Sequence, residues 1–559
     1  MFLRTTTSVL AVVAFAAPAL AEVTPSEVWQ NWVEYYKANG YTVTEGARDE
    51  AGETLTLRDV VVGYEQPDEG TRVEFRTPEI TMTATGDGRV RTTLAETSPV
   101  TATFRDSEGG QVTLNGSLVA RDTEILSGGT ASDMTHESRS GELTLALQSV
   151  QTAEGTREVP ASVKLVNATS RQQITDAEMM RFDATMAADR MEIAADYADP
   201  EGSEAPGRIK VNGSLENLQA TSAGSLPKDV DISQAMHTAL RAGMDVTAAL
   251  TAGQGRLDLD FAGTDDQGQQ DTAKANTTLQ GVDVTLALGP QGLKYQGGID
   301  STSTEMTVSD LPAPVGYTLT EASFDMQFPV LKAAEPAPFK FAYSIGGLTL
   351  ADSVWDLFDS ARVLPRDPAS LDVDLTGLVR VTMDLFDPAL MEAAEQAEAA
   401  GEEHAHGDEE HAHGDAPAAE GDPAAPATAP SAETGAAPAE DSAELPPEMP
   451  SPFEPVQVAI NKLALSAAGA SLDASGELSV PEGGNPEQPV GQVQARFEGV
   501  NGLIDRLVQM GVISQDEVAG YRMMLALFAR PAPEGGDALV GQYEFREGGQ
   551  IFANGQQVQ

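Results

Sequence analysis

The sequence predicts a mainly β protein with a few α-helices: one large, antiparallel, half-solvated and elongated sheet, with an N-terminal helix and C-terminal covering helices. Three observations predict this fold. Apolar residues alternate with Thr, Asp, Glu or Arg in many separate runs. Turn signals rich in Gly and Asn separate these runs at hairpin spacing. Cysteine is absent, so the stability of the chain has to come from burial rather than from disulfides.

The first 21 residues form a secretory signal pattern. Arg4 provides a basic start, residues 9–17 are apolar, and Ala19 and Ala21 are small residues of the kind that flank a cleavage site. We therefore expect cleavage after Ala21 and a periplasmic mature chain. A membrane span requires about 20 apolar residues. Neither this stretch nor any later one reaches that length, so we expect no transmembrane anchor after cleavage.

The mature chain opens with the signature of a helix. Thr24 fits the N-cap, Pro25 the first helical position, Glu27 the third position of a capping box, and Gly40 follows the last turn. Apolar side chains recur between them at helical spacing. They are Val28, Trp29, Trp32, Val33 and Tyr36. This stripe predicts a helix that docks on the sheet as a lid, and contact with a lipid or a membrane surface is the alternative.

Period-two alternation dominates the rest of the β-rich body, residues 22–386. A clear example places Leu257, Leu259 and Phe261 on one face of a strand, against Asp258 and Asp260. Similar runs lie at residues 54–58, 72–76, 143–147, 282–288, 371–375 and 456–460, and a further pair, Ile80 and Met82, follows an expected proline turn at Pro78. One apolar and one polar face predict a sheet that is wet on one side.

Short helices interrupt the strands. We expect two at residues 232–241 and 352–361, one at residues 503–508, and one that begins at a capping box of Ser514 and Glu517 and runs to Phe528. Such helices most often cover the apolar face of a sheet or close its open end. Residues 456–559 are therefore expected to complete the β-rich body with strands and helices.

Residues 387–455 differ in composition from everything around them. They are dominated by Ala, Pro and Glu and lack apolar periodicity after about Ala400, so they are expected to be a disordered insertion in the body. Within them, Glu402–Asp408 is repeated without change as Glu409–Asp415. The repeat supplies the candidate metal ligands His404, His406, His411 and His413. Paired imidazoles beside carboxylates can bind zinc, nickel or copper(II), although a soluble low-complexity tract is the simpler interpretation.

Composition and motifs argue against several classes of function. The chain carries 86 Asp and Glu against 34 Lys and Arg, a net charge of -52, which disfavours nucleic acid and anionic membrane surfaces. It contains no Gly-x-Ser-x-Gly, His-Glu-x-x-His or phosphate-loop motif, so we predict no enzyme, no catalytic residue and no bound cofactor. His136, in an expected polar turn, and His237, in a short helix, are both predicted to lie on the surface.

The C-terminal hundred residues resemble an exported alphaproteobacterial family, domain of unknown function 2125 (DUF2125). The resemblance rests on the strands at residues 456–465 and 491–497, the segment at residues 499–508, the helix through Phe528 and the closing strand that ends in Asn554-Gly555. The early run of residues 52–62, followed by Pro78-Glu79-Ile80, fits the same pattern. More distantly, the chain is similar to AsmA-like envelope proteins with long β-grooves. The resemblance implies a fold and a compartment, and no site residue.

Two functions remain. The first is a non-enzymatic periplasmic protein whose apolar groove binds a lipid, another hydrophobic ligand or an envelope protein. The alternative is metal buffering through the duplicated His tract. The first function uses most of the sequence, whereas the second uses about fifteen residues, so the first is favoured.

Overall fold

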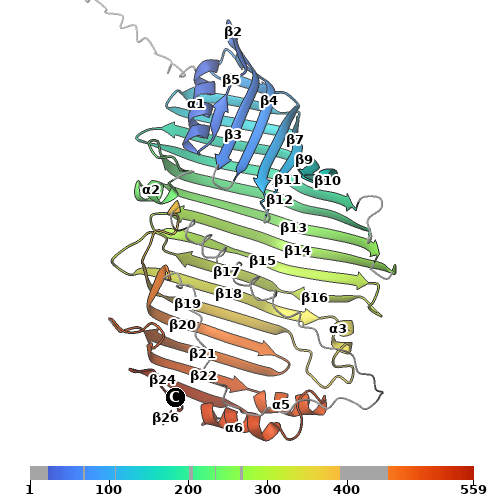
Figure 1. Ribbon diagram of the computed structural model, residues 1–559, viewed down its shortest axis with the longest axis vertical. Helices are drawn as coiled ribbons and strands as arrows, with labels where there is room; N and C mark the ends of the chain where they lie inside the picture. Colours follow the sequence, from blue (N-terminus) through green and yellow to red (C-terminus); the bar gives the residue numbers. More distant parts are fainter. Residues whose placement is uncertain are drawn as a thin grey trace, which may run out of the picture.

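The chain forms one very large sheet. The computed structural model describes residues 23–66, 70–106, 109–199, 206–232, 235–264, 268–388, 390, 451–481 and 483–559. Within these residues 26 strands join in a single sheet, and all paired strands are antiparallel. Figure 1 shows the strands stacked along the longest axis of the molecule, almost in the order of the sequence. The predicted mainly β, antiparallel fold is confirmed.

The described elements have these bounds. The strands are β1 Thr42–Thr44, β2 Ala47–Ala51, β3 Thr54–Gln66, β4 Thr71–Ala84, β5 Val90–Leu94, β6 Thr97–Arg105, β7 Gln111–Arg121, β8 Glu124–Thr130, β9 Asp133–Thr152, β10 Gly155–Asp176, β11 Met179–Ala198, β12 Gly207–Pro227, β13 Asp245–Thr264, β14 Gln270–Gly289, β15 Gly292–Val308, β16 Val315–Leu319, β17 Glu321–Phe328, β18 Ala337–Leu350, β19 Ala369–Val381, β20 Phe453–Ala467, β21 Ala470–Ser479, β22 Val490–Glu498, β23 Arg530–Pro531, β24 Leu539–Arg546, β25 Gln550–Ala553 and β26 Gln556–Gln557. The helices are α1 Pro25–Ala38, α2 Met236–Arg241, α3 Asp352–Asp356, α5 Val500–Gln509 and α6 Val518–Phe528.

Most strands pair with the strand that precedes them and the strand that follows them. The exceptions are places where two strands share one neighbour: β1 and β2 both pair with β3, β5 and β6 with β4, β7 and β8 with β9, β16 and β17 with β15, and β22 and β23 with β24. Strands β19 and β20 pair antiparallel from Ser370 with Ser466 to Val381 with Phe453, so the long segment between them leaves and re-enters the sheet at neighbouring strand ends. The sheet is therefore a meander.

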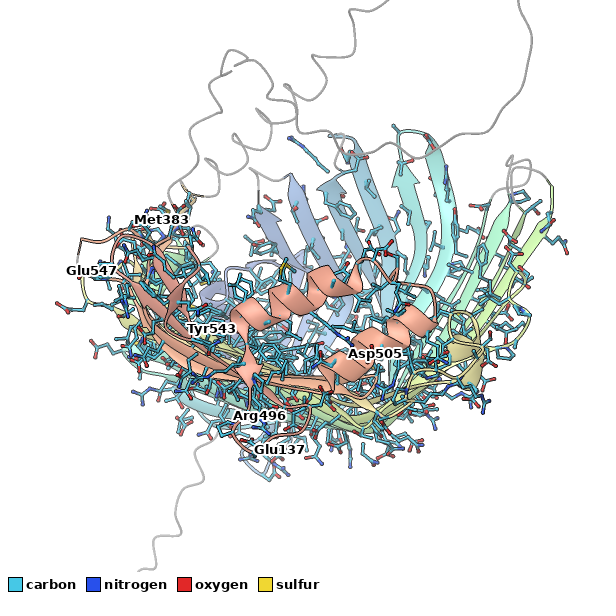
Figure 2. The ribbon with its side chains drawn as sticks, turned by 90° about the horizontal axis from the view of Figure 1, so that it is seen from below. Glu137, Met383, Arg496, Asp505, Tyr543 and Glu547 are labelled. Atoms are coloured by element: carbon cyan, nitrogen blue, oxygen red, sulfur yellow. The ribbon has the colours of Figure 1, made fainter. Side chains whose placement is uncertain are left out.

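The sheet is strongly curved. Seen along its length, it bends into a half-open shape with a concave and a convex side (Figure 2). Tyr543 lies on the concave side, whereas Glu137 and Arg496 lie on the convex side. We call the concave side the inner face and the convex side the outer face.

A crease crosses the middle of the long strands. Regular pairing is interrupted at the same level from β9 to β15, and several residues there have a positive φ, including Asn167 at 52° and Asn217 at 56°. The crease positions, in strand order from the turn after β7, are Asp122, Gly141, Asn167, Asp189, Asn217, Gly253, Gly281 and Asp300. Local irregularities of this kind bend a strand, so an aligned row of them bends the whole sheet.

The crease also reverses the alternation of side chains. In β12, Leu215 and Leu218 belong to the same hydrophobic cluster although they lie three residues apart, a spacing that places residues on opposite faces of a regular strand. In β10, Leu165 and Ala168 behave in the same way around Asn167. Large apolar residues therefore continue on the inner face on both sides of the crease, although their positions in the sequence change from odd to even or from even to odd.

Helix α1 docks on the inner face at the N-terminal end of the sheet, as its apolar stripe predicts. The capping box is present, with the Glu27 amide donating to Thr24 Oγ1 and the Thr24 amide donating to Glu27 Oε2. Val28 and Trp29 are buried against a cluster that includes Leu57 of β3 and Met134 of β9. The expected lid is confirmed.

The expected proline turn is wrong. Pro78 lies inside β4, opposite Asp59 of β3, whose φ is 50°. On its other side, β4 pairs with β6 before this point and with β5 after it. The ring nitrogen of proline cannot donate a hydrogen bond. Neither β6 nor β5 pairs with β4 at Pro78, so no backbone donor is needed there.

The other expected helices are present with different bounds, and α5, Val500–Gln509, is longer than the predicted residues 503–508. Helix α2 begins at Met236 rather than at residue 232, and α3 ends at Asp356 rather than at residue 361. Ser514 and Glu517 make the predicted capping contacts, but α6 begins only at Val518. The expected covering role is met in part, because α5 buries Ile504 whereas α6 buries none of its residues.

The crease predicts a specific response to substitution at Asn217. Replacing Asn217 with Val should lower the free energy of unfolding by about 1–2 kcal/mol, because a β-branched residue is strained at positive φ. Asn217→Gly should leave it nearly unchanged, since glycine accepts this conformation. Urea unfolding followed by circular dichroism measures both variants. Equal destabilisation by Val and Gly would contradict a backbone role for this residue.

Candidate functional site: the inner face of the sheet

The inner face is a continuous apolar surface. Residues directly opposite one another in neighbouring strands share a face, so the pairing register traces rows across the sheet. One such row runs from β11 to β24. Its members are Ala184, Ser222, Ala248, Leu286, Tyr295, Met326, Phe341, Leu375, Ile460, Gly476, Val493 and Tyr543. Twelve strands at the usual spacing make this row about 50 Å long.

Charged side chains are missing from the inner face along this row. At the positions of β11 to β22 that share a face with the row, the described strands carry a single charged residue, Asp271, which lies next to the start of β14 and accepts a hydrogen bond from Ser309 Oγ. The other polar residues there are neutral, such as Ser222, Thr277 and Thr304. The surface can therefore contact hydrocarbon without leaving a charge unsolvated.

Much of this apolar surface is open to solvent. Large hydrophobic side chains on the inner face of β9 to β20 are between 36% and 50% exposed. They are Leu145, Val163, Ile193, Ile209, Leu257, Leu286, Tyr295, Met306, Tyr317, Tyr343 and Leu465. A second layer normally covers the apolar face of a sheet. An exposed apolar surface this extensive indicates a binding surface.

A hollow lies in the floor of the inner face, near the middle of the sheet. It encloses about 500 Å³, within the usual range for ligand sites. The hollow is lined by small side chains, those of Ala184, Ala220 and Ala248, and by the larger side chains of Met186 and Leu286. The hollow and the apolar rows around it form a shallow groove, which we call the apolar groove.

The outer face has the opposite character. Cross-strand ion pairs cover it, for example Lys274 with Asp260 at 2.8 Å and Lys462 with Asp372 at 2.9 Å. The hydrogen bond from Lys462 holds the pKa of Asp372 below its usual value. Exposed pairs of this kind contribute little to stability, but they keep this face wet and oppose a slip in register.

The paired aspartates of the sequence belong to this outer face. Asp258 accepts hydrogen bonds from Arg256 and Asp260 pairs with Lys274, while Asp374 accepts one from Asn461. The Arg256 guanidinium lowers the pKa of Asp258. These carboxylates are committed to surface ion pairs and hydrogen bonds, and they face away from the apolar groove.

Helices close parts of the groove. At the N-terminal end α1 covers the inner face of β3 to β9, and α2 packs beside Phe182 and Leu226 along one side. At the C-terminal end α5 and α6 lie on the concave side of the last strands (Figure 2). Apart from the side on which α2 packs, the described helices leave the middle of the groove, from β10 to β20, uncovered.

His136 is buried, which corrects the surface position that its sequence predicts. It lies in β9 on the inner face, beneath α1, and is only 5% exposed. Its Nδ1 lies 2.8 Å from Ser127 Oγ and accepts from Trp32 Nε1 at 3.3 Å, while its Nε2 lies 2.9 Å from Asn31 Oδ1. In the neutral ring with hydrogen on Nε2, the ring donates to Asn31 Oδ1, and Ser127 and Trp32 share the single lone pair on Nδ1.

This Ser, His and Asn arrangement resembles the chain of hydrogen bonds in a nucleophilic site. Ser127 is completely buried, however, and α1 lies over it, so no substrate can reach its hydroxyl in this arrangement. The network attaches the lid to the sheet. The signal that could have located His136 is its alternation with Thr135 and Glu137, which places it beside Met134 on the apolar face.

The candidate metal ligands His404, His406, His411 and His413 lie outside the described residues. Among the described residues no group of three or more His, Asp or Glu side chains is arranged to hold a metal ion. His237 lies in α2, as expected, and its Nδ1 is 3.2 Å from the carbonyl oxygen of Phe386. In the part of the chain that the structure describes, no helix is long and apolar enough to cross a membrane.

Part of the chain matches a known protein family. Residues 330–551 match the model of a family described as an uncharacterised protein conserved in bacteria, DUF2125. The matched region contains β18 to β24 and the helices α5 and α6, which together form the C-terminal half of the groove. The early run of residues 52–62, expected to share the resemblance, lies outside it. Searches of curated proteins and of solved structures found no match.

The buried histidine predicts how stability depends on pH. Burial lowers the pKa of His136 to about 4 from a usual value of 6.5. Between these two values the unfolded chain binds a proton that the folded chain does not. Stability should therefore be complete above pH 6.5 and should fall as the pH is lowered toward 4, by up to about 3 kcal/mol.

Urea unfolding at a series of pH values measures this effect, with His136→Gln as the reference variant. Acid-induced loss from other groups is common to both proteins, so the difference between them isolates the histidine. A wild-type protein that loses no more stability than the variant between pH 6.5 and 4 would refute the assignment.

Proposed function

We propose that the protein is a non-enzymatic periplasmic protein that binds the hydrocarbon chains of a lipid in its apolar groove. The single observation that carries this proposal is the inner face itself: about 50 Å of adjoining strands with large exposed hydrophobic side chains and, from β11 to β22, only one charged residue, Asp271 at the start of β14. The compartment rests on the signal pattern that ends at Ala21.

Burial of hydrocarbon supplies the binding energy in this proposal. Each Å² of apolar surface removed from water contributes about 25 cal/mol, and a chain lying in the groove removes surface on both partners. The groove offers few polar groups to fix a headgroup, apart from neutral hydroxyls such as those of Ser222 and Thr304. Selection should therefore depend on chain length and unsaturation more than on headgroup chemistry.

An envelope protein is the other occupant that the sequence allows, and the groove favours lipid over it. A protein segment brings backbone amides and carbonyls that need partners when buried. The inner face consists of strands whose own backbone groups are already paired on both sides, from β9 to β22. Hydrocarbon needs no such partners.

Charges placed in the groove should abolish binding. In the double variant Leu257→Glu and Leu286→Glu, carboxylates replace two side chains of the inner face that are already 42% and 45% exposed, so folding should be preserved. We expect at least tenfold weaker binding of a fluorescent lysophosphatidylcholine, because the lipid chain would have to desolvate these charges.

The matched control adds the same two charges to the outer face, as Thr278→Glu and Thr285→Glu on β14. This variant should bind the probe as the wild type does. Equal binding by the wild type and both variants would show that the inner face is not the lipid site, and the absence of binding in all three would refute the proposal.

A second candidate function is metal buffering. It is favoured by one observation, the unchanged repetition of Glu402–Asp408 as Glu409–Asp415, which concentrates His404, His406, His411 and His413 in fourteen residues. Such a tract would bind zinc, nickel or copper(II) through imidazole nitrogens, weakly and reversibly.

Deletion of residues 402–415 tests this second function. Isothermal titration with zinc at pH 7 should give heat of binding for the full chain and at least a tenfold loss of affinity for the deletion. Lowering the pH to 5 should weaken binding to the full chain, because protonated imidazole cannot ligate a metal. Unchanged zinc binding after the deletion would exclude the tract as the site.

A further inference from the structure

Helix α6 has an apolar side that no other described element buries. Five of its large hydrophobic side chains are between 40% and 73% exposed, and none of its residues is buried. At 100° per residue these five lie within an arc of about 160° on one side of the helix. They are Tyr521, Met523, Met524, Leu527 and Phe528. A surface helix normally turns such a stripe toward the core.

The helix is nevertheless held in place. Arg522 pairs with Asp505 of α5 at 2.6 Å, and Asn554 Nδ2 donates to the carbonyl oxygen of Phe528 at 3.1 Å. Directly after the helix, Ala529 is 3% exposed and the chain enters β23. The contacts that fix α6 thus come from its polar side and its end, and they leave the apolar arc facing outward.

The apolar arc lies at one end of the groove. Helices α5 and α6 lie on the concave side of the last strands, at the C-terminal end of the curved sheet (Figure 2). Val512, in the turn that joins the two helices, is 65% exposed and adds to the same end of the molecule. A lipid that enters or leaves the groove at this end would pass the arc.

The size of the arc argues against a second copy of this chain as its partner. Eleven residues make a helix about 16 Å long. A stable protein interface needs about 800 Å² from each partner, and one face of so short a helix provides a small part of that. A bilayer makes no such demand, since a short amphipathic helix can lie in its interface with only the apolar side immersed.

We propose that the apolar arc of α6 docks the C-terminal end of the groove on a zwitterionic lipid bilayer. The inference rests on the proposed function, because a lipid ligand has to be exchanged with a membrane. The net charge of -52 would be repelled by an anionic surface, so a zwitterionic one fits best. Flexible methionine side chains suit a fluid surface that has no fixed shape.

Flotation of the full mature chain with phosphatidylcholine vesicles tests the docking. The variant Met523→Glu with Met524→Glu should reduce the vesicle-bound fraction at least tenfold, since both charges would enter the interface. The matched control, Ala519→Glu with Ala526→Glu, adds the same charge to exposed positions on the opposite side of α6 and should float as the wild type does. Replacing half of the lipid with phosphatidylglycerol should lower flotation of the wild type.

Several outcomes would overturn the docking. They are failure of the wild type to float, equal flotation of the two double variants, and a concentration-dependent dimer without flotation that the methionine variant abolishes. Probe binding in solution separates this inference from the proposed function. The methionine variant should still bind fluorescent lysophosphatidylcholine. Wild-type protein that floats but binds no probe would refute the lipid groove and leave the membrane contact standing.

Discussion

The structure depends on a single constraint: an antiparallel sheet gathers most of its large apolar side chains on one face, and among the described residues no second layer covers the whole of that face. In most domains a sheet of this kind buries its apolar face against helices or another sheet. Here the helices cover only the ends and one side, for example α1 over Leu57 and Met134. The uncovered middle remains apolar and exposed, and the outer face carries the charges that keep the chain in solution.

The crease solves a geometric problem that this constraint creates. Strands of about 20 residues, such as β10 and β11, have to curve to form a concave surface, and a regular ladder resists such a bend. Residues at positive φ, including Asn167 and Asn217, bend the strands at one level. The same residues reverse which side chains point to the inner face. The apolar residues of each strand accordingly change from odd to even positions, or from even to odd, across the crease. The crease positions thus determine both the curvature of the sheet and the pattern of apolar residues along its strands.

The sequence predicted the parts of the fold that local patterns specify. Alternation identified strands such as the one that carries Leu257 and Leu259, and the capping box of Thr24 and Glu27 located α1 correctly. Strand length could not be predicted. At the crease the alternation of apolar and polar residues shifts by one position, and in the sequence such a shift looks like the end of one strand and the start of another. His136 was misplaced for a related reason: its burial depends on Trp32 and Asn31, which lie about a hundred residues earlier in the chain.

The apolar face was predictable from the sequence, whereas its being open or closed was not. Period-two patterning indicates an apolar face, but only the register shows that Leu286, Tyr295 and Phe341 form one uninterrupted row. Whether such a face closes on itself is a tertiary property. The exposure of α6 was equally hidden, since its apolar stripe has the same pattern as that of a covering helix.

Native mass spectrometry of the protein isolated from its own host, without detergent, tests the central claim most directly. If hydrocarbon occupies the apolar groove, the mature chain should carry bound masses that match membrane lipids, and these should be lost from the Leu257→Glu and Leu286→Glu double variant. If the wild-type chain is detected without bound lipid even at low collision energy, and its mass spectrum matches that of the variant, the account is contradicted.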